Sequence, residues 1–336
     1  MHPALQGILT IAVGVGGCVS YFYFSNLLLD KVLFPPRGPN AGRNINRANL
    51  IRPWLFLFPA IAALGLYLAY PVFETFRMSL SERLPGNESQ FVGLDNYRQM
   101  FSETKFWEAM RNNILWLLVV PALSTVFGLL AAQLSDRVRW GNIAKSLIFM
   151  PMAISFVGAA VIWKLVYDTR PIEQEQIGVL NALYLYFGGT EPQTWLTIPI
   201  WNSFFLMIVL VWIQTGFAMV ILSAALRGIP EETIEAAIVD GANPFQIFFK
   251  IKVPQIKGTI IVVWTTITIV VLKVFDIVYA MTNGQWETQV LANYMYDKLF
   301  RANDWGVGSA GAMVIMLLVT PILVWNVYNA RKEMKS

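Results

Sequence analysis

The sequence has few of the residues that build soluble proteins and metal sites. Only 14% of its 336 residues are charged, whereas a soluble domain carries about 25% charged residues. It has a single cysteine, Cys18, and a single histidine, His2, which excludes a disulfide framework and a Cys/His zinc site of the usual kind. The chain also lacks a G-x-x-x-x-G-K-[ST] phosphate-binding loop. These absences argue against a water-soluble protein.

Hydrophobic residues make up 56% of the chain, and they are concentrated in long runs that are almost free of charge. A charged side chain at the centre of a bilayer costs roughly 2.5 to 3.5 kcal/mol, so such runs are typical of membrane spans. We therefore predict an all-α, polytopic membrane protein with about seven transmembrane helices, and we interpret the first run as a retained span rather than a signal peptide. The predicted spans are 7–29, 54–73, 113–134, 147–167, 201–222, 259–280 and 307–328.

The basic residues indicate the orientation of the spans. Alternate connecting segments hold fifteen Lys and Arg residues in one set and eight in the other. Because cytoplasmic loops carry the excess of Lys and Arg, we predict an outside N-terminus and a cytoplasmic C-terminus. The net charge of +4 therefore reports topology, and we expect no nucleic-acid partner.

The cytoplasmic stretch after the fifth predicted span contains helix start and stop signals. Pro230, followed by two glutamates, predicts the start of a short helix over 234–239. Gly241 permits a turn, and Asn243 before a proline predicts a helix cap. The second helix should stop near Val253, because a residue that precedes a proline disfavours helical geometry.

This stretch resembles the E-A-A-x3-G-x9-I-x-L-P signature of the membrane subunits of binding-protein-dependent ABC importers. Valine at position 253 in place of leucine is the only departure. The resemblance implies a type I ABC importer permease core over 54–336, with a coupling helix at 230–254 that docks on an ATPase subunit. Residues 1–53 would be an extra N-terminal transmembrane helix with a basic linker. The alternative is an amphipathic hairpin without a partner. The predicted ATPase-coupling residues are Glu235, Ala236, Ala237, Asp240, Gly241, Asn243, Pro244, Ile251 and Pro254.

The same resemblance implies the partners and the location. We expect a second homologous permease subunit, a pair of cytoplasmic ATPase subunits, an extracytoplasmic solute-binding protein and membrane lipid, in a bacterial cytoplasmic (inner) membrane. The chain itself would be non-catalytic and would hold no cofactor and no metal, since ATP and Mg would be bound by the ATPase subunits.

Two further segments resemble the carbohydrate branch of these importers, the maltose-type sugar permeases. Residues 91–97 are similar to its F-x-G-L-x-N-Y element, and residues 275–284 are similar to F-D-x-x-Y-x-L-T-x-G-G-P. Met281 replaces the leucine of the second pattern, and Gln285 and Trp286 replace its last glycine and proline. The resemblance implies import of an oligosaccharide or glycoside, with an α-glucoside favoured. A polyol or glycerol-phosphate-type solute, or an ion-coupled secondary transporter, is the alternative.

A sugar path needs hydrogen-bonding groups and aromatic faces in a concave setting. Leu210, Gln214 and Phe217 share one face of the fifth predicted span, and the alternative role for this face is helix packing. Lys273 and Asp276 are spaced as an i, i+3 pair that would either neutralise two charges or contact sugar hydroxyls. Lys164 is expected to extend to the membrane interface.

Overall fold

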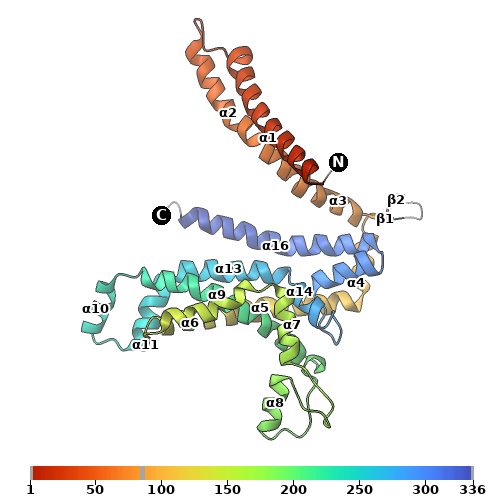
Figure 1. The fold of residues 1–336 in the computed structure, drawn as a ribbon, viewed down its shortest axis with the longest axis vertical. Helices are drawn as coiled ribbons and strands as arrows, with labels where there is room; N and C mark the ends of the chain where they lie inside the picture. Colours follow the sequence, from red (N-terminus) through yellow and green to blue (C-terminus); the bar gives the residue numbers. More distant parts are fainter. Residues whose placement is uncertain (1–2, 84–87, 334–336) are drawn as a thin grey trace. The chain divides into compact units, whose positions relative to one another are not determined.

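The computed structural model describes residues 3–83 and 88–333, so His2 lies outside the described residues. The prediction of an all-α membrane protein is confirmed, with one two-stranded hairpin, β1 (Ser81–Arg83) and β2 (Ser89–Phe91), as an addition. The chain forms two compact units, Met1–Glu74 and Thr75–Ser336 (Figure 1). The predicted boundary between residues 53 and 54 stays a prediction.

The first unit consists of long helices with apolar surfaces. Helix α1 (Pro3–Leu27) continues as a π-helical turn, Leu28–Leu33, and α2 (Ala41–Leu64) continues through Gly65–Ala69 into α3 (Tyr70–Ser79). The Tyr21 hydroxyl donates to the Leu55 carbonyl at 2.9 Å, and Asp30 pairs with Arg52 at 2.6 Å. Most apolar side chains of α1 and α2 are exposed. Helix α1 and the part of α2 from Trp54 onward carry no charged residue, and an uncharged helix with apolar side chains exposed all round is typical of a membrane span.

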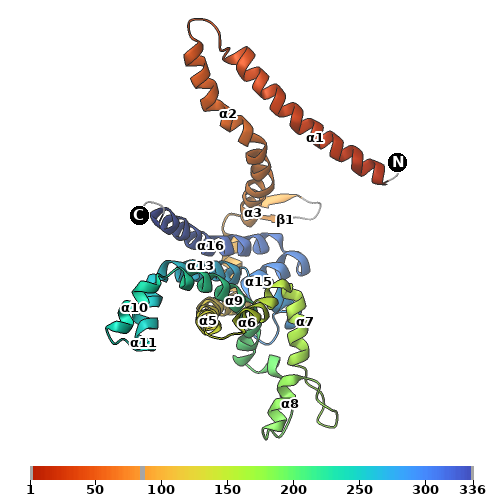
Figure 2. The ribbon, with the colours of Figure 1, turned by 60° about the vertical axis from the view of Figure 1, so that its left-hand side comes forward.

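The second unit is a helical bundle (Figure 2). Helices α10 and α11 lie at one end of helices α5, α9 and α13, and α4 lies at the other (Figure 1); we call these the α10 end and the α4 end. Its helices are α4 (Asp95–Ser102), α5 (Thr104–Ser135), α6 (Gly141–Phe149), η3 (Met150–Ala153), α7 (Phe156–Val166), α8 (Val179–Tyr186), η4 (Trp195–Thr197), α9 (Trp201–Arg227), α10 (Glu231–Val239), α11 (Pro244–Gln246), η5 (Ile247–Lys252), α12 (Val253–Gln255), α13 (Lys257–Leu272), α14 (Asp276–Met281), α15 (Leu291–Tyr296), η6 (Asp297–Arg301) and α16 (Trp305–Glu333).

The core of the bundle is the contact between α5 and α9. A Cβ atom on Gly128 of α5 would overlap the Cβ of Ala218 on α9, so only glycine allows this approach. Small residues that bring helix backbones together are typical of packing within membranes. Trp116, Leu206, Leu210 and Met219 are fully buried around this contact.

Five of the seven predicted spans coincide with long apolar helices among the described residues, and two do not. The predicted fourth span, 147–167, is bent by 106° between α6 and α7. Pro151 lies in the 3₁₀ turn, Ile154 is extended, and Ser155 caps α7 by accepting a hydrogen bond from the Gly158 amide. The prediction of one continuous helix is therefore wrong, because a proline cannot donate to the helix ladder and a serine cap restarts it.

The predicted sixth span, 259–280, is also interrupted. Helix α13 ends at Leu272, and α14 begins at Asp276 after three residues that belong to neither helix. Lys273 is the first residue of this interruption, and Asp276 directly follows it. Asp276 is the first residue of α14, where a carboxylate is stabilised by the helix dipole.

Candidate functional site

The segment over 230–254 forms the helix, turn and helix that its sequence predicts. Helix α10 begins at Glu231, directly after Pro230, and carries two glutamates in its first turn. Gly241 has φ of +79°, a conformation that costs other residues roughly 1–2 kcal/mol. Asn243 and Gln246 form a reciprocal capping box, with both hydrogen bonds at 2.9 Å. The turn and the cap are confirmed.

The end of this segment differs from the prediction. The helix does not stop near Val253 but runs through Pro254 to Gln255, after a π-helical stretch over Ile247–Lys252. The wider π-helical turn changes which carbonyl faces the proline ring, so the usual clash within an α-helix is relieved. The sharp change of direction, 70°, comes one residue later, between α12 and α13.

The segment over 230–254 exposes several apolar side chains, and two of its predicted coupling residues, Glu235 and Asp240, are acids. Val239 is 87% exposed and Phe245 is 77% exposed, and Ile238 and Phe249 are exposed as well. Glu235, Ala236, Asp240, Gly241, Asn243, Pro244 and Pro254 are exposed or half-buried, Ala237 is buried and Ile251 is half-buried. An exposed apolar surface next to carboxylates is the chemistry of a protein docking site.

A carboxylate at the α10 end joins three helices, α5, α6 and α9, and the sequence reasoning missed it. Asp136, directly after α5, accepts hydrogen bonds from Lys145 of α6 and from Arg227, the last residue of α9. Lys145 also donates to Ser223 at 2.7 Å. Partial burial alone would raise the pKa of Asp136, but the bonds from Lys145 and Arg227 hold that pKa below its ordinary value. The signal was present in the sequence, because Asp136 is the only acid in the connection over 135–146.

The interruption between α13 and α14 opens a cavity of about 160 Å³. Leu210, Lys273 and Asp276 line it, so three of the five predicted path residues meet there. The predicted i, i+3 pair is wrong, since the two charged residues do not share a helix and no ion pair joins them in the described part of the chain. The remaining lining residues are Phe156, Val270, Val274, Phe275 and Ile277.

The other two predicted path residues lie away from this cavity. Gln214 is buried within α9, and Phe217 is partly buried against the main hydrophobic core. Lys164, in the last turn of α7, is on the short helix that follows the 106° bend.

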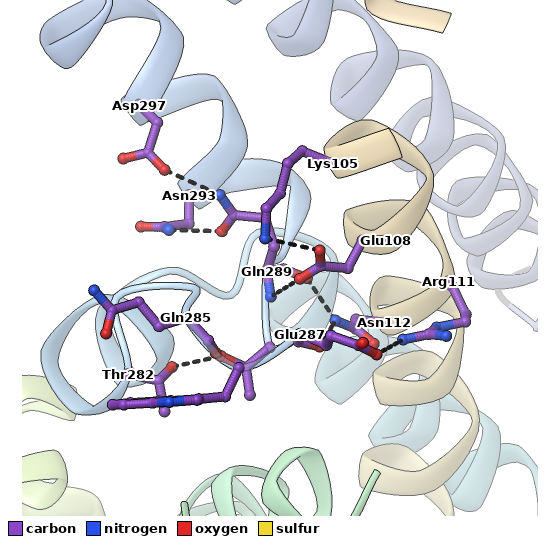
Figure 3. A network of polar contacts seen from close by, with 12 residues as sticks. Lys105, Glu108, Arg111, Asn112, Thr282, Gln285, Glu287, Gln289, Asn293 and Asp297 are labelled. Atoms are coloured by element: carbon purple, nitrogen blue, oxygen red, sulfur yellow. Dashed lines mark hydrogen bonds and ion pairs between the residues drawn. The ribbon is translucent and has the colours of Figure 1, made fainter. Parts of the chain in front are cut away.

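At the α4 end, a polar network holds the loop after α14 onto α5 (Figure 3). The Asn112 amide donates to the carbonyls of Glu287 and Gln289, both at 2.8 Å. The Asn113 side chain accepts from the Leu291 amide at 2.8 Å. Gln289 extends the network to Asp297 at 3.0 Å. The sequence reasoning missed these contacts, for which the Asn112-Asn113 pair at the start of a predicted span was the available signal.

The same loop departs from the carbohydrate-branch pattern in its backbone. Trp286, at the position where the pattern has proline, has φ of +53°, and Glu287 has φ of +61°. Proline is fixed near −65°, so this loop has a conformation that the pattern's proline would forbid. The Asn202 side chain donates to the Trp286 carbonyl at 2.5 Å and holds the loop against the start of α9.

Comparison with known proteins assigns the architecture. Residues 124–335 match the family described as binding-protein-dependent transport system inner membrane component. The chain belongs to this family. The permease is 63% identical over 337 residues to the alpha-glucoside transport system permease protein AglF of Rhizobium meliloti, and the match covers 99% of each chain.

Two further comparisons agree. The permease is 46% identical over 281 residues to the osmoprotective compounds uptake permease protein GgtC of Synechocystis sp., covering 84% of this chain and 99% of that one. It shares its fold with a chain of a bacterial ABC transporter that imports the acidic polysaccharide alginate, at a TM-score of 0.72 and 22% identity over 86% of this chain and 98% of that chain. The protein is thus a non-catalytic permease subunit in the inner membrane, and ATP is hydrolysed by a separate subunit.

Proposed function

We propose that this permease conducts a glycoside, with an α-glucoside favoured, into the cell as part of an ATP-driven importer. The observation that carries the solute class is the 63% identity with an alpha-glucoside permease over 99% of both chains. The lactose and trehalose/maltose permeases among its relatives support the wider class. Membership of a binding-protein-dependent family argues against the ion-coupled alternative.

In this proposal the α10 end faces the cytoplasm and the α4 end faces outward. The excess of Lys and Arg in the connections on the α10 side supports this orientation, as does the exposed apolar surface there, which needs a partner. The partners are a second homologous permease, a pair of ATPase subunits that hold ATP and Mg, and a solute-binding protein at the α4 end. A related alginate transporter has been crystallised in complex with its solute-bound periplasmic protein.

The coupling segment is the contact with the ATPase. Glu235 and Asp240 offer carboxylates to basic groups, and Ala236 allows close approach. The turn at Gly241 and the cap at Asn243 fix the angle between α10 and the helix that begins at Pro244. Ile251 and Pro254 belong to the return limb, and Ala237 packs inward.

Movement of the coupling segment would reach the solute path through rigid contacts. Arg227 ends α9 only a few residues before α10 begins, and it is bound to Asp136 at the end of α5. Closure of the ATPases on ATP would move α10 and, through α9, the wall of the cavity that contains Leu210. The ATPase contact and the cavity would then both act on the position of α9, so binding at either site would affect binding at the other.

The cavity at the helix interruption is the solute contact of this chain. Lys273 and Asp276 are not paired with each other, so their polar atoms are available to sugar hydroxyls. Apolar residues fill the rest of the lining, as in most sites for small molecules. Gln214 and Phe217, one and two turns along α9 from Leu210, would contribute to helix packing or to a later part of the path.

The test is solute-stimulated ATP hydrolysis by the reconstituted complex. The permease and its co-expressed partners are placed in liposomes with ATP, and the binding protein is added. ATPase activity is then measured separately with maltose, sucrose, trehalose, glycerol and glucosylglycerol. Stimulation by the α-glucosides is expected. The GgtC relative favours osmoprotective compounds as the second candidate; stimulation by glycerol but by none of the glycosides would overturn the proposed solute class.

A further inference from the structure

A line of aromatic rings runs from the cavity at the helix interruption toward the start of α16. Phe275 lines the cavity and stacks on Tyr279, with ring centroids 5.0 Å apart and planes within 25°. Tyr296 contacts both rings at 5.2–5.3 Å, and Phe300 follows at 5.0 Å from Tyr296. We call Phe275, Tyr279, Tyr296 and Phe300 the aromatic track.

These rings are not a buried core. Phe300 is 63% exposed, Tyr279 is exposed, and Phe275 and Tyr296 are half-buried. Three separate elements present them: the break before α14 together with α14 itself, the end of α15, and the π-helical turn η6. A contiguous exposed aromatic surface of this kind marks an interaction site.

Polar groups flank the track along its length. The Arg301 guanidinium lies over the rings of Tyr279 and Tyr296, at 5.7 and 5.9 Å from their centroids. It is fixed there by Asn283 at 2.8 Å and by Asp297 at 3.0 Å. A surface within the hydrocarbon core would not hold a carboxylate, an amide and a guanidinium beside its rings, because each is costly there.

One ring of the track lines a cavity, and the arginine that lies over two of its rings lines another. At one end Phe275 shares the 160 Å³ cavity with Lys273 and Asp276. Beside Tyr279 and Tyr296, the residues that fix Arg301 line a second cavity of about 360 Å³. Aromatic faces between clusters of hydrogen-bonding groups match a pyranose ring, which has an apolar C–H face and a rim of hydroxyls.

We propose that the aromatic track is an entry subsite on which a glycoside stacks before it reaches the Lys273–Asp276 cavity. The proposal rests on the proposed function and adds to it the outer part of the path. It predicts that Phe300, the most exposed ring, is in water and is covered by the solute during transport.

The test uses the single natural cysteine. In a Cys18→Ser background, Phe300→Cys is compared with Phe187→Cys, an aromatic position that is 82% exposed and lies outside the track. The assembled complex is labelled with a charged methanethiosulfonate reagent, with and without maltose, binding protein and ATP. The expected result is fast labelling at both positions and a severalfold slower rate with maltose at position 300 alone.

Three outcomes would overturn the proposal. No labelling at position 300 would mean that lipid or a partner subunit covers it, and equal labelling with and without maltose would mean that no solute passes there. The third outcome is that the unsubstituted complex takes up no maltose; this result would contradict both the proposed function and the role of the aromatic track. If the unsubstituted complex transports maltose but position 300 is unprotected, only the track fails. Phe300→Ala should lower maltose uptake severalfold, and Phe300→Tyr should restore it.

Discussion

Arg227 binds Asp136 through two nitrogen atoms, with Nη2 at 2.9 Å and Nε at 3.2 Å from the same carboxylate oxygen. This contact joins the last residue of α9 to the residue that follows α5, 91 positions away in the sequence. Lys145 of α6 binds the same oxygen. One carboxylate therefore pairs with two cations from two helices beside the coupling segment.

Replacing Asp136 with Asn should uncouple the importer. The amide keeps the size of the side chain but removes the charge that holds Lys145 and Arg227, so α9 is freed from α5 and α6. We expect solute uptake to fall severalfold while ATP hydrolysis continues. Asp95→Asn is the matched control, because Asp95 is 64% exposed in an ion pair with Arg98 and lies at the α4 end; it should behave like the unsubstituted protein. Equal uptake by both variants would show that the contact is not part of coupling.

The same carboxylate predicts a dependence of stability on pH. Because the pKa of Asp136 is lower in the folded protein, its ionised form stabilises the fold above the ordinary aspartate pKa of about 3.9, and this stabilisation is lost as the pH falls through the folded pKa. The difference in unfolding temperature between the unsubstituted protein and Asp136→Asn should therefore stay constant from pH 8 to pH 5. It should vanish only in stronger acid. Tryptophan fluorescence in detergent measures it, and a difference that shrinks between pH 7 and pH 5 would contradict the assignment.

Gly241→Ala should weaken the contact with the ATPase. The left-handed backbone at this position would cost alanine roughly 1–2 kcal/mol, and relief of that strain would change the angle after α10. The expected result is a severalfold loss of co-purified ATPase subunits. Gly188→Ala is the control, since Gly188 also has a left-handed φ, +97°, and an added Cβ at either glycine would meet no atom within 4 Å, but Gly188 lies outside the coupling segment. If both variants retain the ATPase, the turn does not define the docking surface.

Val270→Trp should block the path while the complex still assembles. Val270 lines the 160 Å³ cavity and is only partly buried, so an indole there would occupy space that the solute needs. Glycoside uptake should fall to background, while the ATPase subunits still co-purify. Val262→Trp places the same ring at an exposed position on the same helix, α13, and should transport normally. Normal uptake by Val270→Trp would remove this cavity from the path.

Asn112→Ala should loosen the loop after α14. Its amide satisfies two backbone carbonyls and is itself buried, and a buried acceptor left unpaired costs about 1–3 kcal/mol. We expect a lower unfolding temperature and faster protease cleavage within 283–288. Asn142→Ala, at an exposed position on α6, is the comparison, and it should change neither quantity.

Local signals in the sequence determined the membrane class, the coupling segment and much of its geometry. The turn at Gly241, the cap at Asn243 and the helix start after Pro230 depend on residues a few positions apart, so short-range sterics and hydrogen bonding were sufficient to predict them. The family pattern was equally readable, because its spacing is carried within one segment.

Tertiary structure alone decided the features that depend on distant residues. The interruption at Lys273 lies within a run that is apolar enough for one span, and its cavity exists because Leu210 of another helix faces it. Asp136 meets Arg227, and Asn112 meets Glu287, across 91 and 175 positions. Periodicity and propensity describe one element at a time, whereas these contacts depend on how the helices pack, and that packing places the charges and rings that we assign to the solute path.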